Sequence, residues 1–319
     1  MSADVPISAS IPETQLRLRR TAWSRSMRVL GSAPVSAWFG MLVIVAYAIV
    51  AVFAPWIAPH GEAEVFEKAY APWAYALAWP WDVWLQGKPF ITATGSGFWL
   101  GTDQLGRDML TRLIYGARNT VGIALTTALL SFLVGGTLGM LAGTLRGWFD
   151  TVISRIIDAL MSIPVLVFAL MLLSIYGSNW LNLILIIALL DSTRVFRLAR
   201  ALTQGVAAMD YIEAAQLRGE TLPWLLFREI LPNIAPPLIL EFGLRFCFVF
   251  LTISSLGFLG VGIQPPTADW GTMVAENATL ITYGNITPLL PAGAIALLTV
   301  AVNFVVDWFL HRASGLKNG

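Results

Sequence analysis

The sequence predicts an all-α membrane protein with six transmembrane helices and both termini in the cytoplasm. Of its 319 residues, 57 % are hydrophobic and only 12 % are charged, whereas about 25 % are charged in soluble domains. Several nearly uncharged stretches reach the roughly 20 apolar residues that one helical crossing of a bilayer requires. An ordinary soluble protein is therefore excluded. The net charge of +1, without a long basic run, argues against nucleic-acid binding.

The first transmembrane helix is predicted over residues 35–58, after a polar cytoplasmic tail over residues 1–34. This uncharged run is longer than the roughly 7–15 apolar residues at the core of a signal peptide, so we expect it to stay in the mature protein. Trp38 and Trp56 suit the headgroup zone at its two ends.

Residues 59–118 are predicted to form a periplasmic insertion followed by an amphipathic segment. The insertion is acidic, too polar to span a membrane, and rich in tryptophan: Trp73, Trp79, Trp81, Trp84 and Trp99. Tryptophans beside charged residues suit a docking surface for another protein, and the same rings also suit the membrane interface. The sequence leaves both interpretations open.

Residues 119–311 are predicted to hold five more transmembrane helices around a cytoplasmic loop at 203–233, and residues 312–319 form a C-terminal tail. The spans are expected at 120–145, at 159–190 as two helices divided by a tight turn at 177–179, at about 234–261 and at about 286–310. With both termini inside, 14 of the 20 Lys and Arg residues lie in cytoplasmic segments, as the positive-inside rule requires.

The second span contains Gly135, Gly139 and Gly143 at four-residue spacing. Such spacing places the three glycines on one helical face, where another backbone can approach closely. Glycine is also simply frequent in membrane helices, which is the alternative explanation.

The residues needed for an enzyme are scarce. His60 and His311 are the only histidines, and the predicted topology places them on opposite sides of the membrane. None of the three lysines stands in a Gly-Lys-Ser or Gly-Lys-Thr sequence, so a P-loop is absent. We therefore expect no catalytic residue, no metal and no cofactor on this chain.

The cytoplasmic loop is the most informative segment. Glu213, Ala214 and Ala215 suit a short helix with a small-residue face, Gly219 permits a tight or left-handed turn, and Pro223 can open a second helix. Such a projecting helix-turn-helix suits docking into a groove on a partner, and an ordinary solvated connection is the alternative. Four arginines either flank that contact or act as positive-inside anchors: Arg194, Arg197, Arg200 and Arg228.

Two charges lie within the fifth span. Glu241 and Arg245 are four residues apart with the acid first, so they share a helical face and can pair. Charges in a bilayer are expected to face protein or water. The pair therefore either braces two subunits or lines a solute pathway, whereas Asp191 is expected near the end of a span, at the interface.

Three sequence blocks together resemble one family. Glu213-Ala214-Ala215, then Arg218-Gly219, with Leu-Pro-Asn after it, is similar to the "EAA loop" of membrane subunits of ATP-driven, binding-protein-dependent importers. The block from residue 101 to 118 is similar to the signature before the second span in the dipeptide, oligopeptide and nickel permeases, and the stretch from 255 to 271 is similar to the same family. The signature positions are Gly101, Thr102, Asp103, Gly106, Arg107, Asp108 and Arg112.

The resemblance implies the type I importer permease fold in the second, "C-type", permease subunit, located in the bacterial inner membrane. It implies a heterodimer with a second permease subunit, two cytoplasmic ATPase subunits that use ATP and Mg, and a periplasmic solute-binding protein. The loop with Glu213 and Gly219 would then be the coupling helix that docks on the ATPase. The block at 101–118 is expected to lie along the membrane surface, with Arg107 and Asp108 tethering it to the neighbouring subunit.

The solute implied by the resemblance is a peptide or a peptide-like molecule. Nickel, opines and peptide antibiotics are the alternatives within the family, and the long tryptophan-rich insertion leaves that choice open. Outside the family, the chief alternative is a gradient-driven secondary transporter. Such a transporter would need coupling-ion sites and related halves, and the chain shows no internal repeat.

Overall fold

The computed structural model describes residues 33–66, 69–71, 73, 75–77, 91–93 and 97–313. Most of the N-terminal tail, the C-terminal tail and Trp79, Trp81 and Trp84 lie outside these described residues. In the first half of the chain the elements are α2 (Val35–Ile57), β1 (Tyr75–Leu77), β2 (Ile91–Ala93), α4 (Met109–Gly116), the π-helical turn η1 (Ala117–Val121), α5 (Gly122–Leu145), α6 (Gly147–Met161) and α7 (Val165–Tyr176).

Every element described in the second half of the chain is a helix. Its elements are α8 (Trp180–Val206), α9 (Asp210–Leu217), α10 (Leu222–Trp224), the π-helical turn η2 (Leu225–Ile230), α11 (Leu231–Phe258), α12 (Trp270–Asn277), the 3-10 helix η3 (Ala278–Tyr283) and α13 (Leu289–Ala313). The all-α prediction is confirmed except for β1 and β2, which pair antiparallel with Tyr75 opposite Ala93. This two-stranded ribbon belongs to the insertion. Its strands pair backbone N–H and C=O groups that no helix satisfies there.

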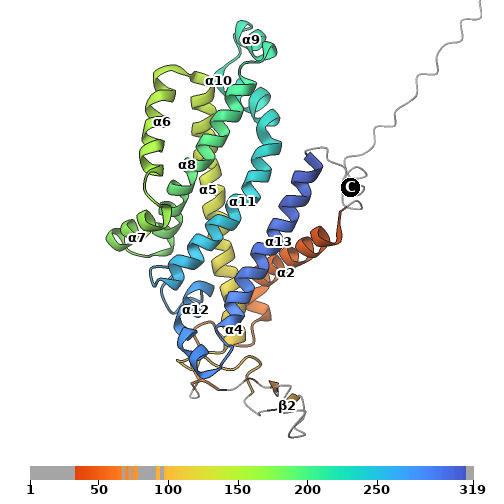
Figure 1. The fold of residues 1–319 in the computed structure, drawn as a ribbon, viewed down its shortest axis with the longest axis vertical. Helices are drawn as coiled ribbons and strands as arrows, with labels where there is room; N and C mark the ends of the chain where they lie inside the picture. The colour runs from red at the N-terminus through yellow and green to blue at the C-terminus, as the bar shows by residue number, and fades with distance from the viewer. Residues whose placement is uncertain are drawn as a thin grey trace, which may run out of the picture.

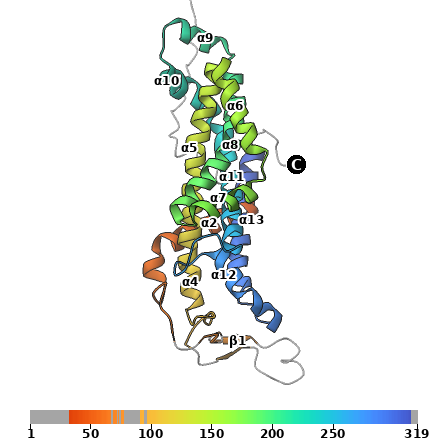
Figure 2. The ribbon, with the colours of Figure 1, turned by 90° about the vertical axis from the view of Figure 1, so that its left-hand side faces the viewer.

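The long helices form an elongated bundle whose two ends differ (Figures 1 and 2). Helices α9 and α10 project from one end, and α4, α12 and the β1–β2 ribbon lie at the other. The first turn of α2 and the last turn of α13 both point toward the α9 end. This arrangement agrees with two termini on the same side as the loop at 203–233.

Among the residues that the structure describes, four helices are long and apolar enough to cross a membrane: Val35–Ile57, Met109–Leu145, Leu222–Phe258 and Leu289–Arg312. The expected third span is bent, because α6 and α7 meet at an angle of 87°. Pro164 stands at that break and cannot continue the α6 hydrogen-bond ladder. The expected fourth span corresponds to α8, whose 27 residues suffice in length but include four charged residues: Asp191, Arg194, Arg197 and Arg200.

The block at 101–118 differs from its predicted position along the membrane surface. Helix α4 continues through η1 into α5 as one helix of 37 residues. No proline interrupts this stretch, so the backbone ladder runs on and α4 extends the second span outward (Figure 2).

The three glycines of α5 face α8, as their spacing predicts. A Cβ on Gly135 would collide with the carbonyl oxygen of Ser192. A Cβ on Gly139 would lie 2.6 Å from the carbonyl oxygen of Phe196. A Cβ on Gly143 would lie 2.8 Å from Thr203 Cβ. Close backbone approach is therefore the reason for glycine at these positions.

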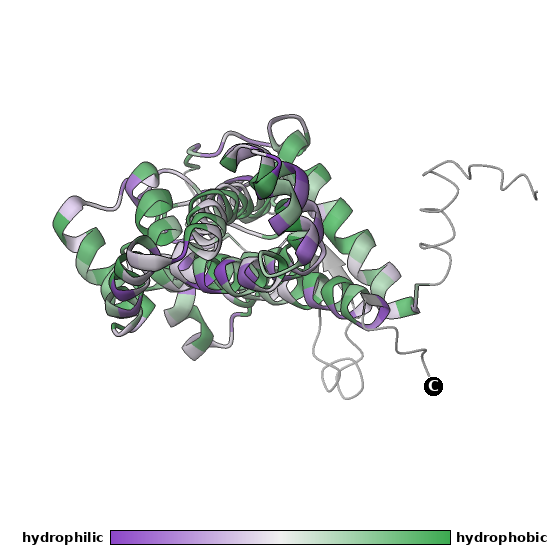
Figure 3. Cartoon of the chain, turned by 90° about the horizontal axis from the view of Figure 1, so that it is seen from above, coloured by the Kyte–Doolittle hydropathy of each residue, from purple (hydrophilic) through white to green (hydrophobic). Residues whose placement is uncertain are grey.

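Apolar side chains cover the outside of the bundle. Viewed from above, every long helix carries apolar residues along its length (Figure 3). Many large ones are exposed, among them Leu42, Leu133 and Ile239, which are 68 %, 63 % and 70 % exposed. Because a soluble protein rarely leaves so wide an apolar surface uncovered, this surface fits contact with lipid or with another membrane chain.

Candidate functional site

Helix α9 is seated on the bundle by its inner face. Ile212 and Ala215 are fully buried, and they pack in one cluster with Leu225, Ile230 and Ile234 of the following helix. These buried contacts fix α9 against the bundle, so the segment is not an ordinary solvated connection. Ala215, one of the residues of the Glu-Ala-Ala motif, faces inward.

The end of α9 is fixed by the glycine of the motif. Gly219 has a φ of +81°, which is the left-handed region that glycine adopts without strain. The Gly219 N–H donates to the Gln216 carbonyl at 2.9 Å, and the Glu220 N–H donates to the Ala215 carbonyl at 3.3 Å. These two bonds form a Schellman motif, which stops the helix and sets the direction of the chain toward α10. The predicted tight turn at Gly219 is confirmed.

The outer face of α9 is open. Glu213, Ala214 and Arg218 are exposed, and Leu217 is 83 % exposed. Within the described part of the chain Glu213 forms no ion pair, and Arg218 reaches Glu220 at 4.0 Å. Three further apolar side chains are exposed around this face: Met209, Tyr211 and Phe227. We call the outer face of α9 together with these three residues the α9 surface; its mixture of apolar and charged groups is typical of a protein interface.

One side-chain hydrogen bond ties α9 to α11. Asn233 Nδ2 donates to the Tyr211 hydroxyl at 3.1 Å and to the Glu229 carbonyl at 2.6 Å.

Replacing Asn233 with Ala is expected to lower the free energy that holds α9 on the bundle by about 1 kcal/mol. Hydrogen exchange of the amides in α9 should then be faster by about fivefold, while exchange in α5 stays unchanged. Equal exchange of α9 in both proteins would show that the Asn233 bond does not seat this helix.

At the opposite end, the 101–118 block forms a buried charge cluster with α12. Arg107 Nε donates to Asp103 Oδ2 at 2.7 Å, and Arg107 Nη2 donates to Glu276 Oε2 at 2.9 Å. Arg112 lies 3.4 Å from both of these carboxylates and is 1 % exposed. We call Asp103, Arg107, Arg112 and Glu276 the external charge cluster. Its charges balance, which reduces the cost of burying four ions.

Arg107 and Asp108, which we expected to tether a neighbouring subunit, are buried and have partners within the chain. Asp108 caps α4: its Oδ2 accepts the Thr111 N–H at 3.1 Å and lies 3.2 Å from His60 Nδ1. The other signature residues shape the same loop. Thr102 Oγ1 accepts the Ala71 N–H at 2.7 Å, and Gly101 and Gly106 have φ values of +74° and +78°.

Asp269 connects the 255–271 stretch to the second span. The Thr120 hydroxyl donates to its Oδ1 at 2.9 Å, and its Oδ2 accepts the Thr272 N–H, capping α12. Burial raises the pKa of Asp269 above its ordinary value. Glu276 and Glu62 are partners within the chain that sequence reasoning did not find; Glu62 Oε1 accepts the Ala268 N–H at 2.7 Å. No local spacing links these acids to residues so distant in the chain.

The predicted pair within the fifth span is confirmed. Arg245 Nε lies 2.7 Å from Glu241 Oε1, and its guanidinium lies 4.7 Å from the centre of the Phe248 ring. Asp191 is buried 3.9 Å from Arg245, so the expectation of an interfacial Asp191 is wrong. Arg200 pairs with Asp150 of α6 at 2.6 Å and thus fixes α6 against α8.

Comparison with known proteins identifies the class. A family model described as the binding-protein-dependent transport system inner membrane component matches residues 135–314, and the N-terminal transmembrane domain of oligopeptide transport permease C matches residues 32–76. The chain belongs to this family of permeases, whose members work with ATPase and solute-binding partners. It is a multi-pass transport subunit of the bacterial inner membrane.

Several relatives cover most of the chain. The di/tripeptide transport system permease protein DppC of Pseudomonas aeruginosa is 35 % identical over 84 % of both chains. The glutathione transport system permease protein GsiD of Pectobacterium atrosepticum is 30 % identical over 94 % of this chain and 93 % of its own. The dipeptide permease DppC of Haemophilus influenzae is 33 % identical over 85 % of this chain and 87 % of its own.

Solved structures agree on the fold. An inward-facing MetNI methionine ABC transporter chain matches with a TM-score of 0.51 at 17 % identity, covering 66 % of this chain and 98 % of that one. A second crystal form of the same transporter gives a TM-score of 0.50, with 63 % and 97 % covered. The predicted type I importer permease fold is thereby confirmed.

Proposed function

We propose that this chain is the second permease subunit of an ATP-driven importer for peptides or peptide-like solutes, and that α9 couples ATP hydrolysis to transport. The solute class rests on the relatives, which are named as di/tripeptide, dipeptide and glutathione permeases. The coupling role rests on the geometry of α9. Its inner face is buried, its end is fixed at Gly219 and its outer face is open.

That geometry is what a mechanical coupling element requires. When an ATPase dimer closes on ATP and Mg, a flexible loop would absorb the movement before it reached the transmembrane helices. Helix α9 instead packs through Ile212 and Ala215 on the start of α11. A displacement of the α9 surface therefore moves α11 and, through the Met140 and Ala199 contacts of the same cluster, α5 and α8.

The remaining partners follow from the same proposal. A second, homologous permease subunit would complete the solute pathway, and a periplasmic solute-binding protein would dock at the end that carries the insertion and α12. ATP and Mg bind to the two ATPase subunits, and the permease chain itself binds neither. The direction of uptake follows, because the solute-binding protein and the ATPases act at opposite ends of the bundle.

The test compares coupling variants in the reconstituted complex with its solute-binding protein and a dipeptide mixture. Glu213→Ala removes an exposed charge from the α9 surface, and Gly219→Ala forces a side chain into a left-handed conformation at about 1–2 kcal/mol. Each is expected to lower binding-protein-stimulated ATP hydrolysis and uptake by about tenfold, a loss of about 1.4 kcal/mol in coupling. Assembly of the complex should be unchanged.

Asp307→Ala is the matched control, since Asp307 is an exposed acid of α13 that belongs neither to the α9 surface nor to the end proposed for the solute-binding protein, and its side chain forms no ion pair among the described residues. It should keep full uptake. Normal uptake by both α9 variants would contradict the coupling role. Solute movement by the purified chain without any ATPase would overturn the importer itself in favour of a gradient-driven transporter.

A further inference from the structure

Arg194 is a charged residue of α8 that the proposed function leaves without a role. Its side chain is exposed, and within the described part of the chain it makes no hydrogen bond and no ion pair within 4.0 Å. The neighbouring charges are already paired: Asp191 lies near Arg245, and Arg200 binds Asp150. Asp191 attracts Arg194 electrostatically without forming an ion pair within 4.0 Å. The guanidinium thus has no direct partner in the described part of the chain, and a costly arginine within a transmembrane helix calls for one.

Arg194 borders a cavity of about 90 Å³ where the bend between α6 and α7 meets α8. The other walls are mostly apolar and come from residues around the bend and one turn of α8: Leu160, Met161, Ile163, Val165 and Leu190. A cavity of this size holds a few water molecules or one carboxylate group.

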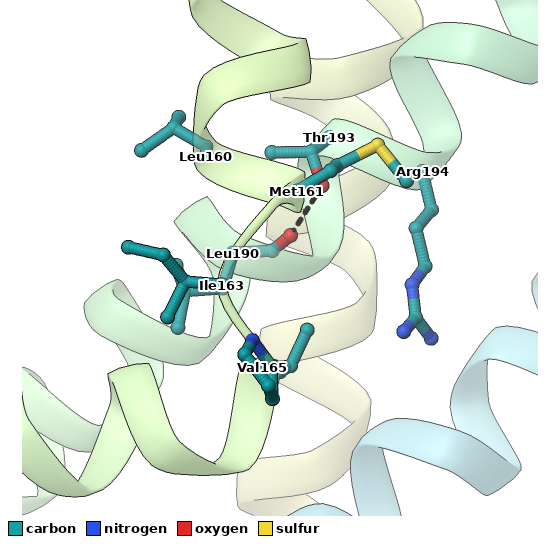
Figure 4. Close-up of a pocket in the computed structure, with 8 residues that line it drawn as sticks. Leu160, Met161, Ile163, Val165, Leu190, Thr193 and Arg194 are labelled. Atoms are coloured by element: carbon teal, nitrogen blue, oxygen red, sulfur yellow. Dashed lines mark hydrogen bonds between the residues drawn. The ribbon is translucent and has the colours of Figure 1, made fainter.

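The side chain of Arg194 does not reach for the cytoplasmic headgroups. In Figure 4 its guanidinium extends away from Leu160, past the level of Val165, which is back toward the beginning of α8. Arg194 is 14 residues after Trp180, or about 21 Å along the helix. A positive-inside anchor would extend the other way, so the geometry favours a ligand within the bundle over a lipid headgroup.

We propose that Arg194 and the cavity at the α6–α7 bend form an anion subsite that binds the carboxylate of the transported solute. The proposal rests on the proposed function for its solute, a peptide-like molecule with a free carboxylate. A planar guanidinium suits a carboxylate because the two groups can form paired, charge-assisted hydrogen bonds. Binding at the bend would place the solute against the segment where the third span changes direction by 87°.

The test uses a cysteine at Ile163 as a reporter of occupancy in the assembled complex. Ile163 lines the cavity and is 38 % exposed, and the single native thiol is removed by Cys247→Ser. The complex is placed in nanodiscs without its solute-binding protein, so that the probe reaches the permease directly. The rate of modification of Ile163→Cys by an uncharged maleimide is measured with millimolar alanylalanine and with its C-terminal amide.

Alanylalanine should slow the modification by about fivefold and the amide by less than about twofold, because only the former carries the carboxylate. Arg194→Gln should abolish this difference, and Arg194→Lys should keep part of it. Arg155→Gln is the matched control: it removes an exposed arginine of α6 that does not line the cavity. It should leave the difference intact.

Three results would overturn the subsite. Ile163→Cys could fail to react, which would show that no solute reaches the cavity. The dipeptide and its amide could protect equally, which would show that no carboxylate is recognised. Protection could instead follow the phosphatidylglycerol content of the nanodisc, which would assign Arg194 to a lipid phosphate. Because this measurement needs neither ATP nor uptake, failure of the importer proposal would appear separately, as absent uptake by the unmodified complex.

Discussion

Replacing Arg112 with Leu is expected to destabilise the protein by about 3–5 kcal/mol, because it removes one cation from a buried, balanced cluster. Asp103 and Glu276 would keep only Arg107 as a charged partner, and Asp103 is 1 % exposed. Thermal or denaturant unfolding in detergent should show the loss, and proteolysis should attack the chain around α12 first. Salt should change the effect little, since buried pairs are poorly screened.

The control for this result is Arg118→Leu. Arg118 lies on the same continuous helix but is exposed, so its loss should cost less than about 0.5 kcal/mol. The double variant Arg112→Leu with Glu276→Gln should cost less than the sum of the two single variants, because the two residues share one network. Strict additivity would mean that the pairing between α4 and α12 does not stabilise the fold.

The second large effect is expected at the contact between α5 and α8. Gly135→Ala places a methyl group against the carbonyl oxygen of Ser192, which is backbone and cannot turn away. The helices must separate, at a cost of about 1–3 kcal/mol. Adding Gly139→Ala, which meets the Phe196 carbonyl one turn later, should lower the yield of folded protein further. Both changes are read by unfolding in detergent and by assembly with the partner subunits.

Gly136→Ala provides the comparison, since a Cβ on Gly136 meets no atom within 4 Å. The substitution is the same and the position differs by one residue. Its stability should equal or slightly exceed that of the native chain, because alanine favours the helix by about 1 kcal/mol. A similar loss for Gly135→Ala and Gly136→Ala would attribute the effect to glycine in general rather than to the α8 backbone.

Sequence reasoning succeeded where the signal is local. The spacing of Gly135, Gly139 and Gly143 predicted a close helix contact, and the four-residue separation of Glu241 and Arg245 predicted their ion pair. Gly219 was predicted to form a turn because few other residues tolerate its backbone conformation. Each of these predictions depends on residues within one or two helical turns.

It failed where the partner is distant in the chain. Sequence reasoning chose no partner within the chain for Arg107, whereas Arg107 binds Glu276, 169 residues away, as well as the nearby Asp103. Asp191 was placed at the interface from its position along one helix, and its partner Arg245 lies on another. The break at Pro164 was hidden because apolar residues surround it on both sides. The roles of Glu213 and Arg218 remain predictions.

The 37-residue helix from Met109 to Leu145 has a further consequence. At 1.5 Å per residue it measures about 55 Å, whereas the hydrocarbon layer is about 30 Å thick. Nearly half of its length therefore exceeds the hydrocarbon layer and belongs to the headgroup zones and the water beyond them. Its outer part is joined to α12 through the Trp270 indole, which donates to the Leu113 carbonyl at 3.0 Å, and its inner part contacts Thr203 through Gly143. A tilt imposed at either membrane face must appear at the other, so one helix alone can carry a signal across the entire bilayer.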